Sequence, residues 1–204
     1  MFASAREFNG EIGTWDTRNV KDMTRMFYGA SSFDKDISTW DTGNVASMRY
    51  MFAGAQAFNR DLCWNTSNVT NMDDMFTRAT SFNGDISKWD VRKVKSAVEM
   101  FSDAKAFNQD ISGWTLSSMQ NMAAMFHSAA SFDQDVSGWA NKAPRAIKSA
   151  SKNAMFVKAK LSSENKRKVV VAWELSEKDC FSMFRTSKDS ILGPAKFGSP
   201  RSYI

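Results

Sequence analysis

The chain has 204 residues, of which 43% are hydrophobic and 24% charged, and its formal net charge is +5. A chain of this length can bury a real core, and no apolar run approaches the roughly 18 residues that cross a membrane. Its two cysteines, Cys63 and Cys180, fit neither a disulfide framework nor a metal-ligand spacing, so we expect free thiols.

The dipeptide Met-Phe recurs along the chain at an almost constant interval, with steps of 25, 25, 24, 25 and 25 residues. The copies are Met1-Phe2, Met26-Phe27, Met51-Phe52, Met75-Phe76, Met100-Phe101 and Met125-Phe126. A period in this range indicates a stack of equivalent supersecondary units, each of which contacts only its neighbours. We therefore predict a solenoid over residues 1–139 with about five and a half repeats, and such a fold usually acts by presenting a surface.

Within each repeat the apolar residues follow one another at steps of three and four, as a helix of roughly three turns requires. In one copy these residues are Val20, Met23, Met26, Phe27, Ala30 and Phe33, preceded by the possible N-cap residues Asp16, Thr17 and Asn19. The remaining segment, such as residues 36–42, is rich in β-branched and aromatic residues and predicts a short strand or extended arm. The predicted fold is thus an α/β repeat solenoid on a leucine-rich-repeat-like plan.

Two sets of aromatic residues are predicted to fill the core of this stack. They are Phe27, Phe52, Phe76, Phe101 and Phe126, and Trp40, Trp64, Trp89 and Trp114. A column of tryptophans could alternatively be a platform for sugars or bases, but a stacked core ladder is the more frequent arrangement. We therefore assign the tryptophans to the core.

The last third of the chain differs from the repeats in pattern and in charge. Residues 1–139 contain 13 basic and 17 acidic side chains, a net charge of −4, whereas residues 140–204 contain 14 and 5, a net charge of +9. Residues 140–190 are predicted to form a degenerate repeat and a helical cap, with Ser162 or Ser163 beginning a helix through 166–177. Residues 191–204 contain two prolines and two glycines and are predicted to be disordered.

The repeat resembles that of the BspA-like leucine-rich repeat surface proteins, which also occurs in mycoplasma-type lipoproteins. The shared pattern, Phe-Asn-x-Asp-Ile-Ser-x-Trp-Asp-x-x-Asn-Val-x-x-Met-x-x-Met-Phe-x-x-Ala, is clearest at 33–55 and 82–104 and covers residues 1 to about 139. The resemblance implies a binding solenoid without an active site, of the kind found in adhesion proteins that are secreted or held at the cell surface. The chain itself contains no recognisable signal peptide or transmembrane segment. Its first residues match the Met-Phe-x-x-Ala of a repeat, so we expect a fragment of a longer array.

A column of acidic residues, accompanied by a column of asparagines, is the most distinctive polar feature. The predicted ladder consists of Asp36, Asp61, Asp85, Asp110, Asp135, Asn59, Asn83 and Asn108. Stacked coils would place equivalent carboxylates roughly 5 Å apart, where like charges repel by about 1 kcal/mol even in water. Calcium ions could bridge them, or each side chain could accept backbone N–H groups at a turn. We favour the second interpretation, with no metal and no cofactor.

The expected function is non-enzymatic binding of a protein or a glycan, without a small-molecule substrate. The only histidine, His127, has no second histidine or cysteine near it in the repeat, and no acid, base and nucleophile converge in the sequence. The variable positions that follow each Met-Phe pair, including Tyr28, Arg78 and Asp103, are the predicted partner contacts. The alternative is an intracellular scaffold whose basic segment, 158–168, docks to nucleic acid or to an anionic membrane.

Overall fold

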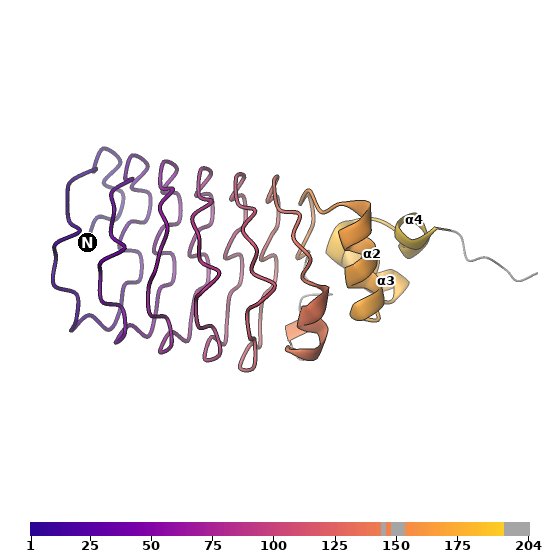
Figure 1. Cartoon of the computed structure of the whole chain (residues 1–204). Coiled ribbons are helices and arrows are strands. Elements are labelled where there is room, and N and C mark those ends of the chain that lie inside the picture. The colour runs from indigo at the N-terminus through magenta and orange to yellow at the C-terminus, as the bar shows by residue number, and fades with distance from the viewer. Residues whose placement is uncertain (144–145, 148–153, 194–204) are drawn as a thin grey trace, which may run out of the picture.

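The computed structural model of the protein describes residues 1–143, 146–147 and 154–193. The repeats run as coils of similar shape that lie one beside the next along a single axis, and the helices gather at one end (Figure 1). The helices whose bounds are described are the 3₁₀ helix η1 (Ser137–Asn141) and the α-helices α2 (Ser163–Ala172), α3 (Glu177–Phe184) and α4 (Lys188–Leu192), and residues 146–147 are helical as well. Among the described residues no helix is both long enough and apolar enough to cross a membrane.

The helix predicted for each repeat is not formed. Residues 1–136, all of them described, contain turns and isolated bridges but no helix. Hydrogen bonds join residues three apart, as from the Met26 amide to the Met23 carbonyl (3.2 Å) and from the Ala30 amide to the Phe27 carbonyl (3.0 Å). A run of such turns brings an apolar residue to the inside every third or fourth position. The same spacing therefore arises without a helix.

Left-handed residues explain why the turns do not join into a helix. From Met26-Phe27 to Met155-Phe156, the residue before each pair has a positive φ, and so does the second residue after the phenylalanine. These residues include Arg25 (φ 58°), Tyr50 (56°), Asp74 (56°) and Glu99 (53°) before the pair, and Gly29 (66°), Gly54 (74°), Arg78 (58°) and Asp103 (56°) after it. A right-handed helix cannot pass through such residues. The backbone amides between them are consequently free to bond to the neighbouring coil.

Backbone hydrogen bonds between coils replace those of a helix. The Met23 amide donates to the Ser47 carbonyl (3.0 Å) and the Phe27 amide to the Met51 carbonyl (2.8 Å), and later coils repeat these bonds. Parallel pairing is limited to isolated bridges at one position per coil: Asp22 to Ser47, Ser47 to Asn71, Asn71 to Ser96 and Ser96 to Asn121. The strand predicted near 36–42 is absent, because a turn from the Trp40 amide to the Ile37 carbonyl occupies that segment.

Columns of stacked aromatic rings run through the interior of the coils. One column has ring centroids 5.4–5.7 Å apart and comprises Phe2, Phe27, Phe52, Phe76, Phe101, Phe126, Phe156 and Phe184. A second phenylalanine column packs beside it, as where Phe52 stacks on Phe58 at 4.2 Å. Trp40, Trp64, Trp89 and Trp114 are also buried, and each indole N–H donates to a carbonyl of the preceding coil at 2.7–3.3 Å.

The C-terminal helices extend the stack and cover its end. The side chain of Ser162 accepts the Asn165 amide and begins α2, which ends at Ala172 rather than near residue 177. The pair Met183-Phe184 continues the Met-Phe column, since the Phe156 amide donates to the Met183 carbonyl (3.1 Å) as each earlier phenylalanine does. Met183-Phe184 can be found in the sequence, but it does not follow the 25-residue period of the earlier pairs, and it lies in the helix α3 rather than in a coil. The tail predicted to be disordered falls outside the described residues from 194 onward.

Candidate binding surface on the coils

Two adjoining pockets lie over the residues that flank the Met-Phe pairs. The tyrosine pocket, about 290 Å³, is lined by Tyr28, Gly29, Tyr50, Ala53, Gly54, Asp74, Thr77, Arg78 and Glu99. The carboxylate pocket, about 300 Å³, is lined by Thr77, Arg78, Glu99, Ser102, Asp103, Ala124 and His127. They share three lining residues, and we call them together the paired pockets. All three predicted contact residues lie here: Tyr28 in the first pocket, Asp103 in the second and Arg78 in both.

Two tyrosines and two arginines form a cluster at the tyrosine pocket. The rings of Tyr28 and Tyr50 meet edge to face, with their centroids 6.3 Å apart. The Arg25 guanidinium lies 5.9 and 5.1 Å from these two centroids, and that of Arg49 lies 5.3 Å from Tyr50. Cation–π contacts of this kind help to hold the rings in place. Tyr28 nevertheless remains 42% exposed and is available to a partner.

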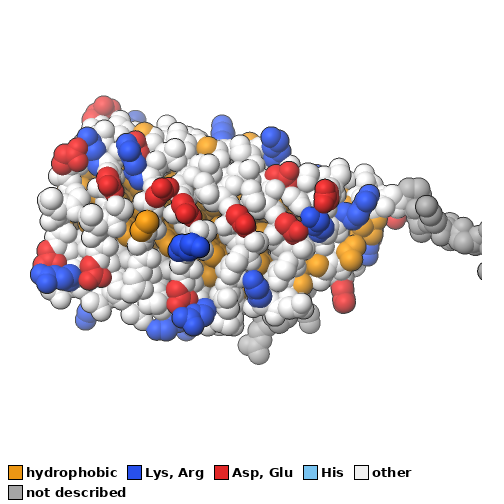
Figure 2. Space-filling view, viewed as in Figure 1, with side chains coloured by type: hydrophobic (Ala, Val, Ile, Leu, Met, Phe, Trp, Pro, Cys, Tyr) orange, Lys and Arg blue, Asp and Glu red, His pale blue; other side chains and the backbone are white. Residues whose placement is uncertain are grey.

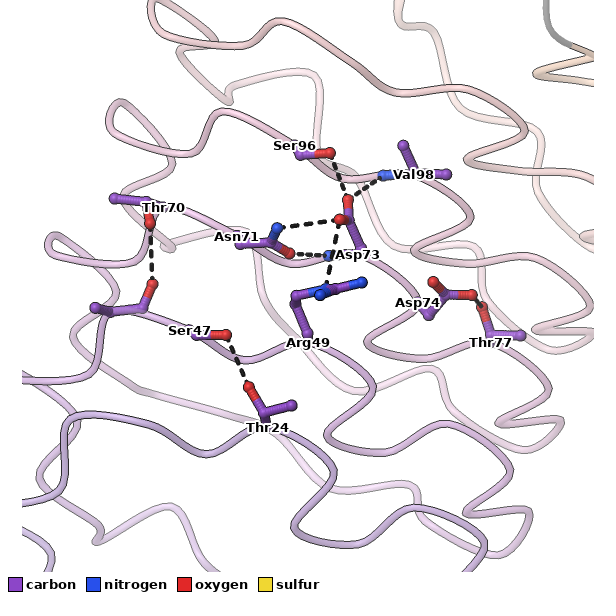
Figure 3. Close-up of polar contacts among 11 residues, drawn as sticks. Thr24, Ser47, Arg49, Thr70, Asn71, Asp73, Asp74, Thr77, Ser96 and Val98 are labelled. Atoms are coloured by element: carbon purple, nitrogen blue, oxygen red, sulfur yellow. Dashed lines mark hydrogen bonds and ion pairs between the residues drawn. The ribbon is translucent and has the colours of Figure 1, made fainter.

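Neighbouring aspartates have different roles at this site. Asp73 accepts hydrogen bonds from the Ser96 hydroxyl and the Val98 amide and lies 3.6 Å from the Arg49 guanidinium, so it joins coils together (Figure 3). Asp74 lines the tyrosine pocket instead and accepts from Thr77 at 3.3 Å. Burial raises the pKa of Asp74, although hydrogen bonds from Tyr50 and Thr77 act in the opposite direction.

The charged side chains of the carboxylate pocket are not paired with one another. Within the described part of the chain, the side chains of Arg78, Glu99 and Asp103 form no hydrogen bond or ion pair. Elsewhere on the coils many charges are paired: Arg18 with Asp16, Arg60 with Asp34, and Arg92 with Asp90, all at 2.7–2.8 Å. On the face shown in Figure 2, charged side chains of both signs are scattered over a surface that is otherwise mostly uncharged, with hydrophobic side chains exposed between them. The carboxylate pocket therefore offers charges that a ligand could pair.

Sequence reasoning missed four lining residues, Tyr50, Asp74, Glu99 and Ala124. Each stands immediately before a Met-Phe pair, whereas the predicted contacts were sought only after it. The two positions lie on one surface because the left-handed residues on both sides of the pair turn the backbone outward there. Variation before the pair (arginine, tyrosine, aspartate and glutamate in successive repeats) was the signal that could have identified them.

Most of the acidic column caps turns within its own coil. Asp36, Asp85, Asp110 and Asp135 each accept the amide of the serine two residues later, at 2.8–3.0 Å. Hydrogen bonds from these serines lower the pKa of all four carboxyls, chiefly from the backbone amide for Asp36, Asp85 and Asp110 and from the Ser137 side chain for Asp135. Asp61 differs: its carboxylate accepts the Asp85 amide of the next coil (2.8 Å), because the shortened segment 61–64 lacks the serine turn.

The accompanying asparagine column joins the coils to one another. Each side-chain oxygen accepts the backbone amide of its equivalent in the next coil at 2.8–3.0 Å. The series runs through Asn9, Asp34, Asn59, Asn83, Asn108 and Asp133 and ends at the Ser162 amide before α2. Within the described ranges, no three histidines, cysteines or acidic residues are grouped so as to hold a metal ion.

The amino-acid sequence of the chain matches a known protein family. The family described as "Mycoplasma protein of unknown function, DUF285" matches residues 1–63 and 62–168, which together make up most of the chain. The chain belongs to this family. The matched region includes every coil that lines the paired pockets and the first residues of α2. A comparison with curated proteins found no match.

The aspartates that cap turns in this DUF285 chain should make the stability of the fold depend on pH. The folded-state pKa of Asp36, Asp85, Asp110 and Asp135 lies below the unfolded value, so their contribution is complete above the unfolded pKa and is lost as the pH falls through the folded one. We expect the melting temperature to fall steadily between about pH 5 and about pH 2. Circular dichroism melts across this range measure the effect.

Calcium provides the control for this prediction. Because each carboxylate already accepts a backbone amide, neither added calcium nor a chelator should change the melting temperature at neutral pH. A calcium-dependent rise that disappears in the double variant Asp61→Asn, Asp85→Asn would show instead that the column is a metal site.

Proposed function

We propose that the chain is a non-enzymatic repeat domain that binds a protein or a glycan through the paired pockets. One observation carries the proposal. Side chains at the variable positions of successive coils converge on one surface, and three of them, Arg78, Glu99 and Asp103, keep their charges unpaired among the described residues. The resemblance to surface adhesion proteins supports action at the cell surface or after secretion.

The scaffold beneath the pockets suits recognition. The phenylalanine of every Met-Phe pair from Phe27 to Phe126 has 0% exposure, and the backbone between the variable residues is bonded to the next coil, as from the Arg78 amide to the Ser102 carbonyl (2.8 Å). Such a framework fixes the positions from which variable side chains project. Little ordering is therefore needed on binding, which favours affinity.

The alternative function, docking of the basic C-terminal segment to nucleic acid or membrane, has less support. Lys168 is engaged with Asp135 (3.3 Å) and Glu164 (3.1 Å), and these contacts reduce the positive charge that α2 offers to a polyanion. Neither a phosphate backbone nor an anionic lipid would find complementary charge in the carboxylate pocket, where Glu99 and Asp103 outnumber Arg78.

Screening the purified chain against an extended-peptide library and a glycan array tests the proposal. For whatever ligand class binds, Tyr28→Ala and Asp103→Ala should each weaken affinity by about tenfold, the effect typical of a contact at the centre of an interface. Lys88→Ala is the matched control, because Lys88 lines a different pocket beside Asp85 and Asp110. Its affinity should stay within about twofold of the parent. Equal losses in all three variants, or no ligand in either class, would contradict the proposal.

A further inference from the structure

We infer that the paired pockets bind an extended peptide segment with a basic side chain in the carboxylate pocket and, four residues away, an aromatic or aliphatic side chain in the tyrosine pocket. The inference rests on the proposed function and gives it a ligand class. Three observations support it: the charges of one pocket, the aromatic and small residues that line one part of the other beside its polar residues, and the spacing between them.

The carboxylate pocket is suited to a cation. The side chains of Glu99 and Asp103 have no partner within the described residues, while Arg78 supplies one positive charge, so the pocket carries an excess of negative charge when His127 is neutral. A lysine ammonium or an arginine guanidinium can form charge-assisted hydrogen bonds with both carboxylates. Neutral sugars would leave these charges without a counter-ion, and acidic sugars would be repelled by them. The pocket therefore favours a basic peptide over a glycan.

The tyrosine pocket is suited to an apolar side chain. Tyr28 and Tyr50 form its aromatic part, and Ala53 and Gly54 add surface without polar side-chain atoms. Arg25 and Arg49 lie against the tyrosine rings but do not line the pocket. They therefore hold the rings while leaving the pocket open to an aromatic or aliphatic group. Tyrosine and arginine are also the residue types most enriched at energetically important contacts.

The distance between the pockets matches an extended chain. Neighbouring coils are separated by 5.4–5.7 Å, measured between the rings of the Met-Phe column. In an extended peptide, alternate side chains point to the same side and are about 6.6–6.8 Å apart. Tyr28 and Tyr50 lie three and two coils away from Glu99 and Asp103, which corresponds to about 11–17 Å along the stack. Residues i and i+4 of an extended peptide point to the same side about 13 Å apart, so a peptide lying along the stack can reach both groups of side chains.

The recognition would depend on side chains rather than on strand addition. Backbone groups at the pockets are already used between coils, as from the Gly54 amide to the Thr77 carbonyl (2.7 Å) and from the Asp103 amide to the His127 carbonyl (2.8 Å). A ligand strand consequently finds no free ladder of amides and carbonyls here. Selectivity should therefore follow the two side chains that enter the pockets.

Fluorescein-labelled peptides of the form Ser-Gly-X-Ser-Gly-Ser-Z-Gly-Ser, together with the reverse order of X and Z, test the inference by fluorescence anisotropy. We expect the strongest binding when X is lysine or arginine and Z is tyrosine or leucine. The double variant Glu99→Gln, Asp103→Asn keeps the shape of both side chains but removes their charge. It should reduce the preference for a basic X by about tenfold and leave the preference at Z unchanged.

Tyr28→Ala should give the opposite pattern, with the preference at Z lost and that at X retained, and Lys88→Ala should change neither. Preferences that are unaltered by these variants, or a preference for an acidic X, would overturn the inference. Binding of glycans alone, weakened by Tyr28→Ala, would overturn the peptide inference and leave the proposed function standing. Binding of neither class would refute both.

Discussion

Replacing Phe52 with alanine is expected to lower the free energy of unfolding by about 3–5 kcal/mol, the range for phenylalanine-to-alanine changes in a packed core. The Phe52 side chain has 0% exposure. Its ring stacks on Phe27 at 5.4 Å and on Phe76 at 5.5 Å, and it also contacts Phe58 and Trp64 within its own repeat. The variant removes contacts to both neighbouring coils, and a rigid stack of rings cannot collapse to fill the cavity.

Chemical denaturation of the parent and the variant measures this loss. The matched control is Arg78→Ala, since Arg78 is exposed and its side chain has no hydrogen-bonding partner within the described residues. The control should stay within about 0.5 kcal/mol of the parent, as surface substitutions usually do. Similar losses in the two variants would mean that the Met-Phe column is not the core of the stack.

The apolar spacing identified which residues face inward but not the backbone that carries them. Val45, Met48, Met51 and Phe52 are all buried, as a helical face would require, yet they lie on successive turns whose hydrogen bonds join residues three apart. Helices and such turns share the steps of three and four, so apolar periodicity cannot separate them. The left-handed conformation at Tyr50 and its equivalents determines that the backbone forms turns rather than a helix. A glycine in a sequence suggests a left-handed residue, whereas tyrosine, arginine and glutamate do not.

The sequence likewise predicted only some of the residues that line the candidate site. Variability after the Met-Phe pair identified Tyr28, Arg78 and Asp103, because positions that a repeat leaves free are those that can differ without harming the core. Tyr50, Asp74 and Glu99 were missed because only the positions after the pair were considered. Residues three or four apart share a face even on the predicted helix, so the position before each pair could have been included.

The second large expected effect is a loss of stability beside residues 61–64, where the repeat is one residue shorter. Gly84→Ala should destabilise the fold by about 3 kcal/mol, the upper part of the range for overpacking. A Cβ atom at residue 84 would lie 2.1 Å from the Arg60 carbonyl oxygen and 2.7 Å from its carbon, both of them backbone atoms that cannot rotate away. Equivalent positions in other coils, such as Lys35 and Gln109, carry full side chains, so the restriction belongs to this junction and not to the repeat.

Gly113→Ala is the matched control, because a Cβ atom there would meet nothing within 4 Å. Neither glycine has a positive φ, so backbone strain does not distinguish the two variants and only the contact with Arg60 does. Gly113→Ala should therefore change the free energy of unfolding by no more than about 0.5 kcal/mol, while Gly84→Ala shows the full loss in the same denaturation experiment. If both variants unfold like the parent, the two coils must stand further apart beside Asp61, and the hydrogen bond from the Asp85 amide to the Asp61 carboxylate would be lost with that separation.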